Sequence, residues 1–126
     1  MNNFLVNVLK IIEIIYRRNS TANAINDHGQ IVGYITFGDF IHATLWENET
    51  FTDLGTLDGF DTSNAADINI LGQIVGNSAI REGNIAHGVT WIDGEIIDLN
   101  DKVHLDDEWL LENAVGIRLF PLFPAK

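Results

Sequence analysis

Short apolar runs, separated by polar turn residues, fill the chain from residue 20 to residue 101. Each run is four to eight residues long and ends at Asn, Asp or Gly, which is typical of β-strands joined by hairpin turns. Glycine is favoured in such turns because it adopts a positive φ without steric cost. The pattern predicts eight strands, at Ala22–Asn26, Gln30–Thr36, Ile41–Trp46, Phe51–Leu54, Ala65–Asn69, Gln73–Ser78, Ala86–Ile92 and Glu95–Leu99.

A different pattern marks residues 4–16, which are almost entirely apolar. Asn7, Lys10, Glu13 and Arg17 recur every three or four residues, which places them on one stripe of a helix. The many β-branched residues leave a strand as the alternative. The run is shorter than the roughly 20 residues that span a bilayer, and it lacks the features of a signal peptide. We expect an apolar helix buried against the chain's own core or a second copy; membrane association and a degraded secretion signal are the alternatives.

An internal repeat relates the predicted strands to one another. Ile25–Gly33 returns as Ile68–Gly76 with seven of nine residues identical, at an offset of 43. His42–Trp46 returns as His87–Trp91 at an offset of 45, which places a variable loop between the two motifs. Four antiparallel strands in about 40–45 residues match one propeller blade. The predicted fold is all-β, with antiparallel four-stranded, propeller-blade-like units, two of them complete and a third begun.

The motifs resemble those of the HAF repeat family, whose pattern is approximately A-x-A-I-N-x-x-G-Q-I-V-G, H-A-x-x-W and D-L-G-x-L-x-G. In this chain they stand at Ala22–Asn26, Gly29–Gly33, His42-Ala43, Trp46 and Asp53–Gly59. The resemblance covers about residues 20–101. It implies a β-rich repeat protein of propeller type, with no established catalytic activity, at the cell surface or outside the cell, although the chain shows no recognisable signal peptide.

Four segments are expected along the chain: an apolar N-terminal helix at residues 1–19, repeat units at residues 20–62 and 63–101, and a truncated third unit with a proline-containing tail at residues 102–126. Both ends depart from the repeat pattern. The hypothesis that follows is a fragment of a longer repeat protein, altered by truncation or by a change of reading frame, with no independent activity.

Charge and composition narrow the partners. The 126 residues contain 18 acidic and 7 basic side chains, for a net charge of -11. Between residues 19 and 101 the only basic side chain is Arg81. Such a surface repels phosphate, so nucleic acid and anionic membranes are poor partners. Ca²⁺ or a basic partner could be attracted, but a solvated acidic face is the simpler interpretation. The absence of cysteine excludes disulfides and thiolate metal ligands.

The candidate functional residues are His42, Trp46, His87 and Trp91, which hold equivalent places in the two units. Their residue types suit either a platform for a carbohydrate or protein ligand, or core tryptophans with structural histidines bonded to the backbone or to a turn residue. Asp53 and Asp98 are expected to cap turns by accepting backbone N–H bonds.

No catalytic motif or metal-ligand pattern stands out in the sequence, so we expect no enzyme activity and no cofactor or metal. The predicted function is a binding or scaffolding module. It is expected to self-associate through open sheet edges or its apolar helix, unless the N-terminal helix and the Phe120–Phe123 tail cap those surfaces. The alternative is a hydrolase or lyase on a propeller scaffold that uses acidic loop residues.

Overall fold

A computed structural model describes residues 5–6, 8–9, 19–102 and 111–117. It confirms the all-β fold and the eight predicted strands, with ends that differ from the predicted ones by at most three residues. The strands are β1 (Ser20–Ile25), β2 (Ile31–Phe37), β3 (Phe40–Glu47), β4 (Thr50–Asp53), β5 (Thr62–Ile68), β6 (Ile74–Ile80), β7 (Ile85–Ile92) and β8 (Glu95–Asp98). A single 3₁₀ turn, η1 (Leu99–Asp101), follows β8.

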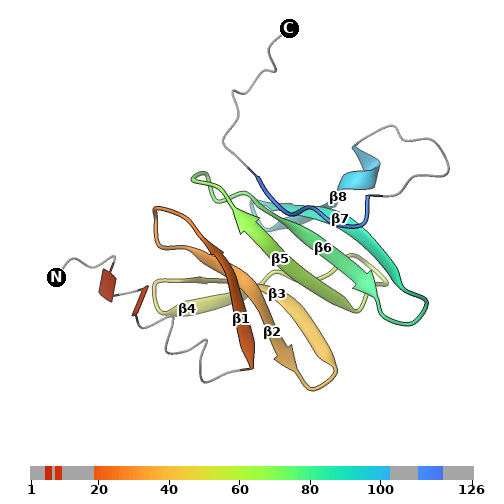
Figure 1. Cartoon of the computed structure of the whole chain (residues 1–126), viewed down its shortest axis with the longest axis horizontal. Coiled ribbons are helices and arrows are strands. Elements are labelled where there is room, and N and C mark those ends of the chain that lie inside the picture. Colours follow the sequence, from red (N-terminus) through yellow and green to blue (C-terminus); the bar gives the residue numbers. More distant parts are fainter. Residues whose placement is uncertain (1–4, 7, 10–18, 103–110, 118–126) are drawn as a thin grey trace, which may run out of the picture.

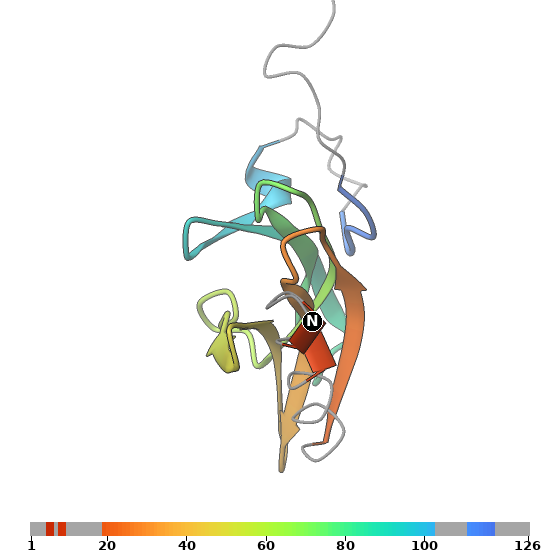
Figure 2. The same ribbon diagram turned by 90° about the vertical axis from the view of Figure 1, so that its left-hand side faces the viewer.

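The strands form one open sheet in the order β1-β2-β3-β5-β6-β7-β8, with β4 paired to β3. All neighbours are antiparallel except β3 and β5, which share one parallel pair, Ile41 with Thr62. The sheet therefore consists of two antiparallel four-stranded parts, β1–β4 and β5–β8, which lie side by side in Figure 1. In the turned view of Figure 2, β1 and β4 form opposite margins of the first part.

Both parts contain the same irregularity in their first strand pair. The pairing of β1 with β2 is shifted by a bulge opposite Gly33, and that of β5 with β6 by a bulge opposite Gly76. A Cβ atom at Gly33 would lie 1.8 Å from the carbonyl oxygen of Thr21, and one at Gly76 would lie 1.9 Å from that of Asn64. Only glycine permits this close approach of two backbones, which explains the last glycine of the repeated I-N-x-x-G-Q-I-V-G motif.

The turns that enter β2 and β6 are closed by asparagine side chains. Asn26 Oδ1 accepts hydrogen bonds from the backbone N–H groups of His28 and Gln30, and Asn26 Nδ2 donates to Gln30 Oε1. Asn69 makes the same bonds with Leu71 and Gln73. Because the residue two positions after each asparagine contributes only its backbone N–H, its side chain can vary. The Asn26–Gly29 loop is therefore an ordinary hairpin turn, as the sequence indicated.

The larger of two core clusters joins the two parts of the sheet. It consists of Val32, Ala43, Ala65, Ile68, Ile74, Val89 and Trp91. Leu54 and Leu57, from the chain that follows β4, pack against it. Since side chains alternate along a strand, Val32 and Ala43 come from one face of the first part and enter the second part's core.

The smaller cluster lies on the opposite face of the first part. Its buried members are Ile31, Ile35 and Trp46, and Val8 packs against them. Leu5, Val6, Val8 and Leu9 have helical backbone, but the rest of the predicted N-terminal helix lies outside the described residues, so the helix stays a prediction. No helix within the described residues is long and apolar enough to cross a membrane.

Residues 111–117, which the sequence pattern predicts to belong to a truncated third unit, run along β6 and β7. The backbone N–H of Gly88 donates to the carbonyl of Leu111 at 2.6 Å, and the N–H of Ala114 donates to the carbonyl of Gly76 at 3.1 Å. The C-terminal tail lies outside the described residues. The second part of the sheet therefore has a neighbouring segment on its far side as well as the first part on its near side.

Candidate functional site

Two histidine–aspartate pairs occupy equivalent places in the two parts of the sheet. His42 Nδ1 lies 2.9 Å from Asp53 Oδ2, and His87 Nδ1 lies 2.6 Å from Asp98 Oδ2. An ionised carboxylate can only accept, so Nδ1 carries the proton and donates it in both pairs. Each pair connects the third strand of its part to the end of the fourth.

The aspartates also hold the turns that follow them. The backbone N–H of Gly55 donates to Asp53 Oδ1 at 2.8 Å, and the N–H of Asn100 donates to Asp98 Oδ1 at 2.9 Å. Both carboxylates therefore accept the backbone N–H bonds expected of turn caps. Gly55 has a φ of 78°, a conformation that favours glycine.

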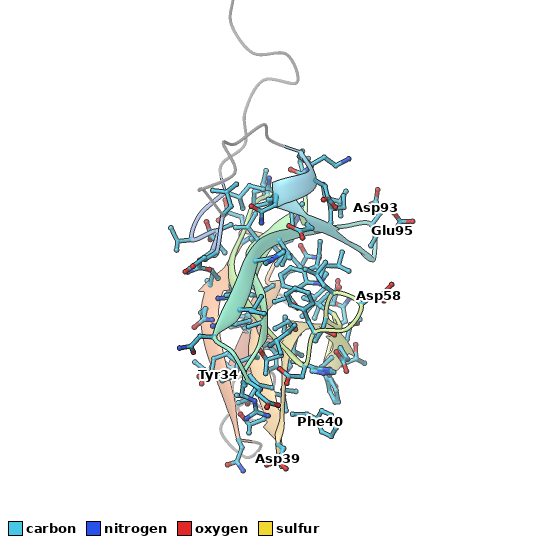
Figure 3. The ribbon with its side chains drawn as sticks, turned by 90° about the vertical axis from the view of Figure 1, so that its right-hand side faces the viewer. Tyr34, Asp39, Phe40, Asp58, Asp93 and Glu95 are labelled. Carbon is cyan, nitrogen blue, oxygen red and sulfur yellow. The ribbon has the colours of Figure 1, made fainter. Side chains whose placement is uncertain are left out.

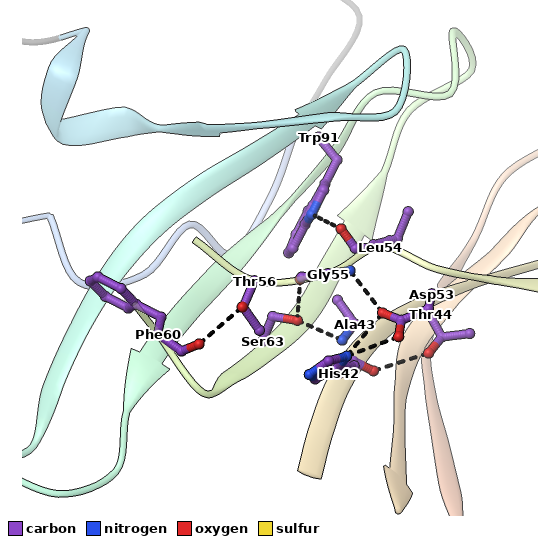
Figure 4. A network of polar contacts seen from close by, with 10 residues as sticks. All are labelled: His42, Ala43, Thr44, Asp53, Leu54, Gly55, Thr56, Phe60, Ser63 and Trp91. Atoms are coloured by element: carbon purple, nitrogen blue, oxygen red, sulfur yellow. Dashed lines mark hydrogen bonds and ion pairs between the residues drawn. The ribbon is translucent and has the colours of Figure 1, made fainter. Parts of the chain in front are cut away.

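The Leu54 carbonyl accepts a hydrogen bond from Trp91 Nε1 at 3.0 Å. Trp91 is 2% exposed, so this bond is made inside the core that the two parts share. Figure 4 shows the chain of contacts from His42 through Asp53 and the Leu54-Gly55 turn to Trp91. The histidine–aspartate pair of the first part thus positions the carbonyl that the tryptophan of the second part binds.

Ser63 joins the same network from β5. Its hydroxyl accepts from the backbone N–H of Ala43 at 2.7 Å and donates to the carbonyl of Gly55 at 2.7 Å. The serine is almost fully buried and links β3, β5 and the turn after β4 where the two parts meet (Figure 4). Because a buried hydroxyl without partners is costly, this serine helps to hold the two parts in one relative position.

Asparagine side chains make further bonds between the two parts. Asn23 Nδ2 donates to Asn64 Oδ1 at 2.8 Å and to the Ala65 carbonyl at 2.7 Å. Asn26 Nδ2, besides closing its own turn, donates to the carbonyl of Asn69 at 2.9 Å. The repeated asparagine therefore has a second function in the first part, as a contact to the equivalent turn of the second part.

Trp46 differs from Trp91 in one respect. It is 0% exposed, yet its Nε1 has no hydrogen-bond partner within the part of the chain that the structure describes. The sequence marks the two tryptophans as equivalent but does not show that a leucine carbonyl is the partner of one of them. The recurrence of Asp53-Leu54 as Asp98-Leu99 is the signal that could have drawn attention to that carbonyl.

The environment of Asp98 lowers its pKa. Burial acts to raise this pKa, but the hydrogen bonds from His87 and Asn100 together outweigh burial and keep the carboxylate ionised to lower pH than usual. Phe60 contacts the imidazole of His87 edge-on, with 5.0 Å between the ring centroids. The His87–Asp98 pair is therefore a partly buried polar contact with an aromatic ring on one side.

A groove of about 270 Å³ lies where β3 meets β5. It is lined by Tyr34, Ile41, Thr62, Ser63, Asn64, Asn77 and Arg81. None of the four candidate ligand residues from the sequence lines this groove: Trp46 and Trp91 are buried in the two cores, and His42 and His87 hold the turns. The structure therefore does not bring these four residues together on one ligand surface.

Acidic side chains project from three turns, one of which carries both Asp93 and Glu95. Asp39, Asp58, Asp93 and Glu95 are exposed and point outward from the ribbon in Figure 3. Among the described residues, no three Asp, Glu or His side chains are grouped so that they could hold a metal ion. These acidic side chains belong to the solvated surface.

No protein-family model, curated protein or solved structure matches this chain. The contacts of the site itself therefore define what it can do. Those contacts form a polar connection between the two parts of the sheet, with one equivalent donor, on Trp46, left without a partner.

Proposed function

We propose that the chain is a non-catalytic repeat module of propeller type, for binding or scaffolding, with units at residues 20–62 and 63–101. One observation carries the proposal: the hydrogen bond from Trp91 to the Leu54 carbonyl, made by motifs that recur at a constant offset. In a repeat protein each unit contacts its neighbours through the same elements, so its stability is a sum of unit and interface contributions. The resemblance to HAF repeats supports the same function.

The packing between the parts supports a stacked arrangement of units. Val32 and Ala43 on one face of the first unit meet Ile74 and Trp91 of the second unit in one cluster. The opposite face of the first unit carries Trp46, in a cluster of its own. Units that present different faces to their two neighbours can be added head to tail, which is how propellers and solenoids are built.

The histidine–aspartate pairs support a structural rather than a catalytic role. In each pair Nδ1 is bonded to the aspartate, and the second carboxylate oxygen accepts a backbone N–H. Both oxygens are thus used to hold a turn. The hydrolase or lyase alternative requires loop carboxylates that converge on a pocket, whereas the acidic residues labelled in Figure 3 are exposed and point outward from three turns.

The repeat architecture is tested by adding a unit. In a chain where residues 20–62 are present twice in tandem, the inserted Trp46 side chain meets a Leu54 carbonyl from the unit before it. We expect one cooperative unfolding transition, with a larger dependence on urea and a higher unfolding free energy than in the original chain. The matched control carries Trp46→Phe in the inserted unit only and should gain less. An insert that adds neither strand signal in circular dichroism nor urea dependence would contradict the proposal.

The absence of catalysis is tested separately. With chromogenic ester, glycoside and phosphate substrates, the full chain and its Asp98→Asn variant should both release product at the rate of buffer alone. Product release by the full chain that disappears in the variant would favour the hydrolase or lyase alternative instead.

A further inference from the structure

The buried indole N–H of Trp46 has no hydrogen-bond acceptor among the described residues. A buried indole N–H without an acceptor is costly, and in native proteins such groups nearly always have a partner. Trp46 is 0% exposed, and its Nε1 has no partner among the residues that the structure describes. The equivalent Nε1 of Trp91 has one, the Leu54 carbonyl. The comparison of these two sites within one chain shows which chemistry satisfies the tryptophan.

The segment that satisfies Trp91 has a defined form. It is the Asp-Leu-Gly-Thr-Leu sequence Asp53–Leu57, in which Gly55 has a φ of 78° and both leucine side chains pack into the core around Trp91. The surface around Trp46 is formed by Ile31 and Ile35, at the positions equivalent to Ile74 and Ser78. The Leu57 N–H donates to the Ser78 hydroxyl, for which Ile35 offers no counterpart. On the Trp46 surface the indole N–H is thus the group that would fix the register of a docked segment.

Two segments of this chain are candidates to cover the surface, and neither reproduces that form. Val8 packs against the cluster and supplies an apolar contact, but Trp46 Nε1 remains without an acceptor. The second unit's equivalent segment, Asp98–Lys102, has Asn100 in place of Gly55 and forms η1, in which the Leu99 carbonyl already accepts the N–H of Lys102. Among the described residues, a second copy of the chain therefore has no free segment of the required kind.

We propose that the Trp46 surface, made by Ile31, Ile35 and Trp46, is a docking site for an Asp-Leu-Gly-x-Leu segment presented by a repeat unit of another protein chain. In the unbound chain these three side chains are 4%, 2% and 0% exposed and Val8 packs against them, so a docking segment must take the place of this cover. The proposal rests on the proposed repeat architecture and adds the partner's chemistry: an extended segment with two leucine side chains and a leucine carbonyl that accepts the Trp46 Nε1–H. Docking would extend the array of units at the Trp46 face.

The test uses the full chain labelled with ¹⁵N and a synthetic peptide with the sequence of Phe51–Gly59. The chain has three tryptophans, and the Trp46 indole signal is assigned from its disappearance in Trp46→Phe. We expect the peptide to move the Trp46 indole proton downfield and to slow its exchange with water, because the proton becomes hydrogen-bonded. A control peptide with valine at the position of Gly55 cannot adopt the required φ and should leave the signal in place.

Two variants measure the role of the N-terminal contact. Val8→Ala should lower the peptide concentration at half saturation, because it weakens the competing contact. Leu9→Ala is the matched control, since Leu9 is 52% exposed and should leave that concentration unchanged. The Trp91 indole signal, already hydrogen-bonded, serves as an internal marker of folding in every sample.

Two outcomes would overturn the docking proposal. If the Trp46 signal is unmoved by saturating peptide in both the full chain and Val8→Ala, the chain's own N-terminal segment is the permanent occupant. If the signal moves with chain concentration alone, without peptide, a second copy is the occupant. In both cases a protected Trp91 signal would leave the repeat architecture standing, so the two proposals fail separately.

Discussion

Replacing each buried tryptophan by phenylalanine separates the contribution of one hydrogen bond from that of packing. Trp91→Phe removes the N–H that binds the Leu54 carbonyl. Trp46→Phe removes an N–H that has no partner among the described residues. Trp91 and Trp46 are 2% and 0% exposed, and they hold equivalent positions in β7 and β3, each paired with an isoleucine, so the loss of apolar contact is similar in the two variants.

The expected difference follows from the hydrogen bond. A neutral intramolecular hydrogen bond contributes about 1 kcal/mol net, and a buried donor without a partner costs about 1–3 kcal/mol. Trp91→Phe loses the former and leaves the Leu54 carbonyl unpaired. Trp46→Phe removes a buried donor that has no partner among the described residues, and so removes its cost. We therefore expect Trp91→Phe to lower the free energy of unfolding by at least about 2 kcal/mol more than Trp46→Phe does.

Urea denaturation followed by far-ultraviolet circular dichroism measures this difference, since tryptophan fluorescence is itself changed by the substitutions. The two transitions should have equal slopes and different midpoints. Equal midpoints, or a lower midpoint for Trp46→Phe, would show that the Leu54 carbonyl does not couple the two parts of the sheet. A double variant should be additive if the two sites are independent.

Three further predictions concern the polar contacts of the repeats. The lowered pKa of Asp98 implies stability that is present above the pKa of an unfolded aspartate, about 3.9, and is lost as the pH falls through the lower pKa of the folded state. Asp98→Asn should therefore show a smaller loss of thermal stability between pH 5 and pH 2 than the original chain. An unchanged loss would contradict the role assigned to this carboxylate. Gly76→Ala should prevent folding or destabilise the chain severely, because its Cβ would lie 1.9 Å from the carbonyl oxygen of Asn64; a normal circular dichroism spectrum and melting temperature would refute this account of the bulge. Asn26→Ala should cost about 1 kcal/mol more than Asn69→Ala in urea denaturation, because only Asn26 also bonds the other unit; equal costs would contradict that contact.

The sequence was sufficient for the strands and their turns because these depend on residues close together in the chain. The asparagine turn at Asn26 is closed by groups within four positions, and Asn69 repeats it. The periodic glycines mark where two backbones approach or where φ is positive. The third-unit tail and most of the predicted N-terminal helix lie outside the described residues, and those predictions stand as they were made.

The sequence was not sufficient for the contacts between the units. The groove where β3 meets β5 is lined by residues from four different strands, and no local sequence pattern predicts it. The order of the sheet, with β5 beside β3 and β4 off the main path, also could not be read from the alternation of strands and turns. Such contacts depend on how two separately formed parts dock.

Trp46 and Trp91 show the difference between what the sequence determines and what the tertiary structure decides. The sequence alone determined that both occupy the same place in a repeated strand, but it left open whether they pack in a core or form a ligand platform. The structure shows that both are buried. Only the tertiary structure decided that one indole N–H binds a carbonyl and the other does not. The acceptor for Trp91 is 37 positions away in the chain and is presented by the preceding unit, so its presence depends on which segment lies across the interface and not on the motif that contains the tryptophan.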